Sequence, residues 1–240
     1  MKTDAIPFAL NRSLDATALA HAFARDGRVQ IADFLVPRAA EALHTILRRR
    51  EDWVQVVNSG EKSFELSRGV RAAMSADQRD ALDNAVYAGA RSGFQYRYES
   101  IRVPDDATER AGTNDPLAAF AAWLSHGEVR DLLRQVTGAA AIDFADAQAT
   151  AFAPGDFLTG HDDDVAGKRR QAAYVLGLTP VWRVEWGGML LFHGHIVQGY
   201  PPVFNTLNLF AVPQRHSVSE VTRAAAYRRY SITGWLRSAQ

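Results

Sequence analysis

Residues 143–163 read DFADAQATAFAPGDFLTGHDD, and this stretch decides the fold class of the chain. Its segments 143–153 and 157–163 each follow a period of two, and the Pro154-Gly155 pair between them favours a turn. The same period continues toward the C-terminus and predicts further strands at 171–178, 188–192, 204–212, 215–218 and 229–236. Many short strands separated by Pro and Gly are typical of a β-sandwich or jelly roll.

The residues before this stretch predict helices. Ser13 is the expected cap of the first helix, and Ser75 with Gln78 forms a capping box before the third. The expected helices lie at 14–25, 37–50, 76–90 and 116–136, with Gly127 as a break in the last, and a short strand is expected at 28–35. We therefore expect an α+β fold that is mainly β, with a jelly-roll core buttressed by N-terminal helices.

Length and composition predict a single domain over 1–240, with helical support over about 1–140 and a catalytic core over about 143–238. The 27 basic and 27 acidic residues give a net charge of zero, so we expect no nucleic-acid partner. The chain has no cysteine, which excludes disulfides, thiolate metal sites and a cysteine nucleophile. No secretory or membrane-spanning pattern is present, and we expect a cytoplasmic protein without a membrane partner.

Three residues are candidate metal ligands. His161 and Asp163 are two positions apart on a predicted strand, so their side chains are expected on one face, and His216 begins another predicted strand. Two imidazoles and one carboxylate form the facial triad of non-haem Fe(II) oxygenases. Such a triad leaves room on the metal for a 2-oxo acid and O₂. The H-x-D pattern alone is weak, because an acidic solvated turn would look the same.

The segment 228–235, RRYSITGW, adds a candidate anion site. Arg229, Ser231, Thr233 and Trp235 share one face of the predicted strand. The planar guanidinium of Arg229 matches a carboxylate, and a neighbouring hydroxyl can add a hydrogen bond. The alternative is a surface strand whose arginines are solvated.

An ordered set of motifs resembles the prolyl-hydroxylase-like Fe(II)/2-oxoglutarate oxygenases, in particular the bacterial relatives of the ribosomal prolyl hydroxylases. The motifs are GHDDD, RQAAYVLGL, WGGMLLF, FNTLNLF, RHSVSEV and RRYSITGW, in this order within about 143–238. The resemblance implies a double-stranded β-helix core, iron ligands at His161, Asp163 and His216, and cosubstrate binding by Arg229 and Ser231. It further implies Fe(II), 2-oxoglutarate and O₂ as cofactor and cosubstrates, with ascorbate as a candidate stimulant.

The sequence departs from the family at two positions. Family members often carry a tyrosine where this chain has Gly177 and an aromatic hydroxyl where it has Phe152. Gln148, Thr150 and Tyr98 are the candidates to compensate, although each is better explained as a core residue or as a neighbour that does not contact the cosubstrate directly.

Further residues are candidates for the mouth of the site. Arg97 and Tyr98 are candidates for contact with the substrate, and the Pro- and Gly-containing segment 199–204 is a candidate lid. The basic run 168–170 and the pair His193 and His195 are better explained as solvated or polar loops.

These observations predict a dioxygenase that hydroxylates an unactivated C–H bond, in a prolyl or other residue of a protein or peptide, with release of succinate and CO₂. A free amino acid or small metabolite is an alternative substrate. A cupin-type enzyme or a sensor domain that does not use 2-oxoglutarate is an alternative function. The residues do not indicate an oligomeric state.

Overall fold

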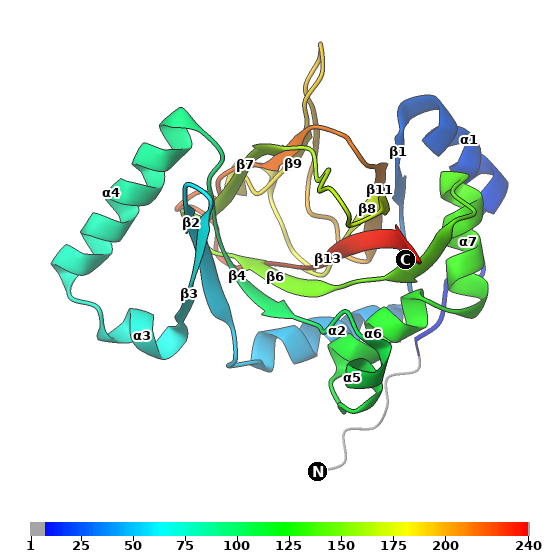
Figure 1. The fold of residues 1–240 in the computed structure, drawn as a ribbon, viewed down its shortest axis with the longest axis horizontal. Coiled ribbons are helices and arrows are strands. Elements are labelled where there is room, and N and C mark those ends of the chain that lie inside the picture. The colour runs from blue at the N-terminus through cyan, green and yellow to red at the C-terminus, as the bar shows by residue number, and fades with distance from the viewer. Residues whose placement is uncertain (1–7, 240) are drawn as a thin grey trace.

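The computed structural model describes residues 8–239 and is built around one curled antiparallel sheet (Figure 1). Its strands are β1 Arg28–Ile31, β2 Val54–Ser59, β3 Lys62–Ser67, β4 Tyr96–Arg102, β5 Ile142–Ala145, β6 Gln148–Phe152, β7 Phe157–His161, β8 Arg170–Gly177, β9 Leu190–Phe192, β10 Gln198–Tyr200, β11 Thr206–Ala211, β12 His216–Val218 and β13 Arg229–Ser238. Its helices are α1 Ala16–Asp26, α2 Pro37–Arg49, α3 Arg68–Ala73, α4 Ala76–Ser92, α5 Ala107–Ala111, α6 Pro116–Leu124 and α7 Gly127–Thr137, with a 3₁₀ turn at Val184–Trp186.

The strand order folds the sheet into two facing parts. The main path is β1-β11-β8-β13-β6-β4-β7-β12-β9-β10, while the β2–β3 hairpin pairs with β4 and the short β5 pairs with β13. Strand β4 pairs with β6 through Glu99–Arg102 and with β7 through Tyr96 and Arg97. It therefore connects the part of the sheet that contains β6 to the part that contains β7. In Figure 1, β7 and β9 lie across the interior from β6 and β13. The expected jelly-roll core with supporting helices is confirmed.

One face of the part of the sheet that contains β6 and β13 packs against helices. Leu43 and Leu47 of α2 are fully buried and belong to the same apolar core as Ile232 of β13. Alternate residues of β6, Ala149 and Ala151, point into this core, whereas the residues between them point to the opposite face. Each buried leucine stabilises the fold by about 1.5–3 kcal/mol. The helices thus hold the sheet that carries the interior site.

The helix predictions are largely confirmed. Ser75 and Gln78 form both hydrogen bonds of a capping box on α4. The break near Gly127 is present, because α6 ends at Leu124 and α7 begins at Gly127. The cap of α1 was wrong: Asp15, not Ser13, accepts hydrogen bonds from the N–H groups of the first turn.

The strand predictions missed the β2–β3 hairpin and the short β10. All residues of β3 except Leu66 are exposed, so burial imposes no alternation on its sequence. The range 143–153 forms two strands, β5 and β6, and the strand expected at 28–35 ends at Ile31. Gly187 and Gly188 have φ of 68° and 63°, so this Gly-Gly turn uses backbone conformations that other residues rarely adopt.

Among residues 8–239, no helix is long and apolar enough to cross a membrane.

Candidate metal centre and cosubstrate pocket

Two paired strands bring the candidate ligands together. His161 is the last residue of β7, His216 is the first of β12, and the two are direct partners in the antiparallel pairing. Their ring centroids are 4.1 Å apart. Asp163 lies beyond the end of β7 with φ of 65°, a left-handed conformation that is uncommon for a non-glycine residue. The expectation that Asp163 continues the strand was therefore wrong, and a turn directs its carboxylate to the two imidazoles.

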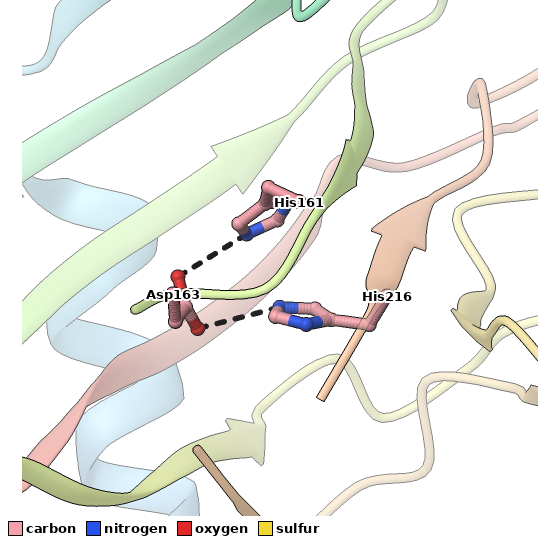
Figure 2. Close-up of side chains that lie close together, drawn as sticks. All are labelled: His161, Asp163 and His216. Carbon is pink, nitrogen blue, oxygen red and sulfur yellow. Dashed lines mark ion pairs between the residues drawn. The ribbon is translucent and has the colours of Figure 1, made fainter. Parts of the chain in front are cut away.

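The three side chains point toward one another (Figure 2). The Oδ1 atom of Asp163 lies 3.3 Å from Nε2 of His161, and its Oδ2 atom lies 3.4 Å from Nε2 of His216. One candidate ligand atom from each residue lies within 4.8 Å of the others. In each imidazole Nδ1 faces a backbone carbonyl, that of Thr159 at 3.0 Å and that of Gln214 at 2.8 Å. A proton on each Nδ1 leaves each Nε2 lone pair free for a metal.

The electrostatics favour the protonation states that ligate a metal. Burial lowers the pKa of His216 to about 4, and the neighbouring His161 adds to this effect. Burial alone would raise the pKa of Asp163, but His161 and His216 outweigh it and the pKa is lowered. At neutral pH, His216 is therefore neutral and Asp163 is ionised. These states fit a divalent cation.

A cavity of about 430 Å³ opens beside the triad. Besides the triad it is lined by aromatic, aliphatic, polar and charged side chains, among them Phe94, Tyr96, Tyr98, Gln148, Thr150, Phe152, Asp162, Asp164, Val165, Arg170, Arg229, Thr233 and Trp235. The lining residues of β6 and β13 come from the face opposite the helix-packed core. The cavity is therefore the interior of the curled sheet.

Arg229 lines the cavity with its charge buried, and it forms no ion pair with the residues that the structure describes, 8–239. It is 3% exposed, and burial lowers its pKa to about 10. Its Nη1 donates a long hydrogen bond to Ser231 (3.4 Å), and its Nε has no partner among the described residues. An uncompensated buried guanidinium is costly, so the pocket is suited to a carboxylate ligand.

The surroundings leave space for this side chain. A Cβ at Gly188 would lie 3.1 Å from Cδ of Arg229, so a larger residue there would press on the arginine. The guanidinium carbon lies 5.1 Å from the centroid of the Phe152 ring. Ser231 is fully buried, and its hydroxyl lies 2.8 Å from that of Thr150.

The two departures from the family pattern have structural explanations. The carbonyl oxygen of Val203 lies 2.2 Å from where a Cβ of Gly177 would be, so backbone occupies the place of a side chain. Val203 thus packs against β8, and residues 199–204 are not among those that line the cavity. The lid expected at 199–204 stays a prediction. Tyr98 stacks on Phe152 at 5.0 Å and brings a phenol into the cavity.

Two sequence interpretations of charged residues were wrong. Arg97 does not face the cavity: it is 6% exposed and lies near Asp83, Asp156 and the carbonyl of Gly155. Arg170 does line the cavity, although the run 168–170 indicated a solvated loop. Its guanidinium lies 3.5 Å from the Trp235 ring centroid and donates to the carbonyl of Asp163 at 2.8 Å. The strand expected at 171–178 begins one residue after Arg170, so the sequence pattern did not place Arg170 on a strand that faces the cavity.

The exposed His195 is outside the cavity lining, and His193 bonds to Ser217 at 2.8 Å, consistent with the polar loop predicted for this pair.

Comparison with known proteins agrees with this site. A model of the 2OG-Fe(II) oxygenase superfamily matches residues 147–237. The prolyl 3-hydroxylase sudestada1 of Drosophila melanogaster is 34% identical over 124 residues, which cover 45% of this chain and 22% of the relative. The chain therefore spans about a fifth of that protein's length.

Solved structures share the fold at low sequence identity. A Pseudomonas putida prolyl-4-hydroxylase has a TM-score of 0.64 and 20% identity, with 94% of this chain and 100% of that chain covered. A Trichoplax adhaerens prolyl hydroxylase, in complex with a peptide fragment of the hypoxia inducible factor oxygen degradation domain, has a TM-score of 0.60 and 16% identity, covering 93% and 89%. The residues that carry the triad and Arg229 thus lie within the range matched by the model of the 2OG-Fe(II) oxygenase superfamily, and the fold of the chain is similar to that of solved prolyl hydroxylases.

Proposed function

We propose that this protein is an Fe(II)- and 2-oxoglutarate-dependent hydroxylase that acts on a prolyl residue of a protein or peptide. The observation that carries the proposal is the convergence, in one cavity, of the His161, Asp163 and His216 triad with the buried and unpaired guanidinium of Arg229. A metal site without a cosubstrate would not need that arginine. An anion site without a metal would not need the triad.

The residues present fit the proposed groups. His161, Asp163 and His216 would hold Fe(II), and three ligands from one side leave coordination positions open. Arg229, supported by Ser231 and Thr150, would hold the distal carboxylate of 2-oxoglutarate. Bound there, the iron and its cosubstrates supply the oxidising chemistry that replaces a C–H bond by C–OH while 2-oxoglutarate becomes succinate and CO₂.

The chain contributes orientation and exclusion of water. The Nδ1 contacts with Thr159 and Gln214 fix the two imidazole rings, and the turn at Asp163 fixes the carboxylate. Aromatic rings line the site: the guanidinium of Arg229 packs against the Phe152 ring, and that of Arg170 packs against the Trp235 ring. Such walls keep the reacting carbon away from bulk solvent.

The prolyl substrate is proposed from the relatives. Sudestada1 is a prolyl 3-hydroxylase, and the two solved structures reported above are prolyl hydroxylases, one of them with a bound peptide fragment. The alternatives are a free amino acid or small metabolite as substrate, and a metal enzyme or sensor that does not use 2-oxoglutarate.

The deciding experiment is succinate formation from 2-oxoglutarate by the iron-loaded protein, with and without proline-containing peptides. We expect turnover that is abolished in His161→Ala and retained in His195→Ala, an exposed histidine outside the cavity lining. Iron binding without binding or consumption of 2-oxoglutarate would reject the proposal in favour of a cupin-type metal enzyme or a sensor domain.

A further inference from the structure

A row of aromatic rings leads from the interior of the cavity to its mouth. Phe94, two residues before β4, and Tyr96 and Tyr98 of β4 alternate along the chain, and all three line the cavity. The ring centroids are 5.6 Å apart for Phe94 and Tyr96 and 5.9 Å apart for Tyr96 and Tyr98. At the inner end Tyr98 stacks on Phe152, which lies beside Arg229. The outer end is therefore the part of the row that is left for a substrate.

The outer end lies beside the metal ligands. The ring of Phe94 is 5.6 Å from the imidazole of His161, and Phe94 is 49% exposed. Val165, which follows the ligand turn, also lines the cavity and is 46% exposed. Exposed apolar side chains that gather around a functional cavity indicate a binding surface.

The backbone that carries this row is held rigidly. The buried side chain of Asn58 donates to the carbonyl of Phe94 and accepts from the N–H of Tyr96, both at 2.9 Å. Between them, the N–H of Gln95 donates to the hydroxyl of Thr159 at 2.8 Å. The half-exposed Phe94 ring is thus presented from a fixed position, which lowers the entropic cost of binding against it.

We propose that Phe94 and Tyr96 form the platform on which the prolyl ring of a peptide substrate lies, and that this platform selects proline over acyclic residues. The inference rests on the proposed function. A pyrrolidine ring is rigid and largely apolar, and aromatic-lined grooves are a recurring mode of binding proline-containing segments. A ring placed on Phe94 lies next to His161 and leaves the part of the cavity between the triad and Arg229 to 2-oxoglutarate.

The test compares two half-exposed phenylalanines. Phe94→Ala removes the platform, whereas Phe64→Ala removes a ring of β3 that is 47% exposed and does not line the cavity. Succinate formation is measured against a set of proline-containing peptides and against the same peptides with alanine in place of proline. We expect Phe94→Ala to raise KM for the proline peptides about 3- to 10-fold, with a smaller change in kcat, and to reduce the preference over alanine peptides. Phe64→Ala should behave as wild type.

Two outcomes would overturn the inference while leaving the oxygenase proposal intact. One is a Phe94→Ala variant with the KM and peptide preference of wild type. The other is a wild-type protein that forms succinate but does not distinguish proline peptides from alanine peptides. Absence of succinate under every condition would instead reject the proposed function, and the inference with it. If Phe94→Ala fails to fold, Phe94→Leu keeps the apolar bulk without the aromatic face and is subject to the same criteria.

Discussion

Two residues of the cavity, Asp163 and Arg229, are held in an unfavourable backbone conformation and an unfavourable environment, respectively. The left-handed backbone of Asp163 and the desolvated guanidinium of Arg229 both cost free energy in the absence of a ligand. Both lie in the cavity and face the same space. Such costs are expected where a binding site is arranged in advance for a metal and an anion.

The cost of Arg229 gives a prediction at the residue scale. Arg229→Met replaces an unpaired buried charge by an apolar side chain of similar length, so the variant without cosubstrate should unfold at a temperature equal to or above that of wild type. The increase in unfolding temperature that 2-oxoglutarate gives the Mn(II)-loaded protein should be lost. Thermal unfolding with and without 2-oxoglutarate measures both effects.

Arg229→Lys is the matched variant, because it keeps the charge but loses the planar fork. It should retain part of the stabilisation by 2-oxoglutarate. A full response of Arg229→Met to 2-oxoglutarate would show that the carboxylate binds elsewhere.

At the scale of elements, a buried carboxylate joins the sheet to the helical segment beside it. Glu99 of β4 is fully buried and forms ion pairs with Arg68 and Arg71 of α3 and with Arg228, which precedes β13. Burial alone would raise the pKa of Glu99, but the hydrogen bond from Arg68 and the charges of Arg228 and Arg71 outweigh it and the pKa is lowered. The cluster fixes β4, whose opposite face carries Tyr96 and Tyr98.

Glu99→Gln should therefore destabilise the fold by about 3–5 kcal/mol at neutral pH, because three arginines lose their shared partner. A carboxyl whose pKa is lower in the folded state contributes stability above its unfolded pKa of about 4.5, and loses it as pH falls through the folded pKa. The difference between variant and wild type should accordingly shrink below about pH 4.5. Chemical denaturation across pH tests this.

Glu65→Gln provides the control, since Glu65 forms only an exposed pair with Arg102. It should change stability by less than about 1 kcal/mol at any pH. An equal loss of stability in the two variants would show that the buried cluster contributes no more to the free energy of unfolding than an exposed ion pair.

The contact between β8 and the segment after β10 is a second feature at this scale. Gly177→Ala would place a Cβ against the carbonyl oxygen of Val203 and should destabilise by about 1–3 kcal/mol, seen as a lower unfolding temperature. Gly93→Ala is the control, because nothing lies within 4 Å of its Cβ position and its φ of −175° suits any residue. Equal unfolding temperatures for both variants would contradict the assigned contact.

At the scale of the whole molecule, the triad lies at the end of the paired strands β7 and β12, where the chain turns toward β8. His161 and His216 lie on β7 and β12, and Asp163 leads back toward β8. A metal ion at this point would tie β7 and the turn that follows it to β12. Ligand that binds only the folded state stabilises it according to its concentration relative to Kd.

Metal binding should therefore raise the unfolding temperature of the entire domain. With Mn(II) at 100 times its Kd, the gain should be about 2.7 kcal/mol, and a chelator should reverse it. In His161→Ala the metal should have little effect, whereas His195→Ala should respond as wild type. Equal stabilisation of wild type and His161→Ala would place the metal outside the triad.

The sequence by itself determined the types of element and the identities of the candidate ligands. Alternation along residues 143–163 and 229–236 depends only on local periodicity, and His161, Asp163, His216 and Arg229 stand out as residue types with a shared chemistry. The β2–β3 hairpin was missed because its second strand is exposed and carries little apolar alternation.

Only the tertiary structure decided which face of each strand looks into the cavity. The alternation of a strand predicts that Arg97 and Tyr98 lie on opposite faces of β4. The pairing of β4 with β6 and β7 determines that Tyr98 faces the cavity and Arg97 faces away from it. It likewise decided that Val203 fills the place of a side chain at Gly177, and that Phe94 lies beside His161. These outcomes depend on contacts between residues far apart in the chain, and local sequence patterns carry no information about register between strands.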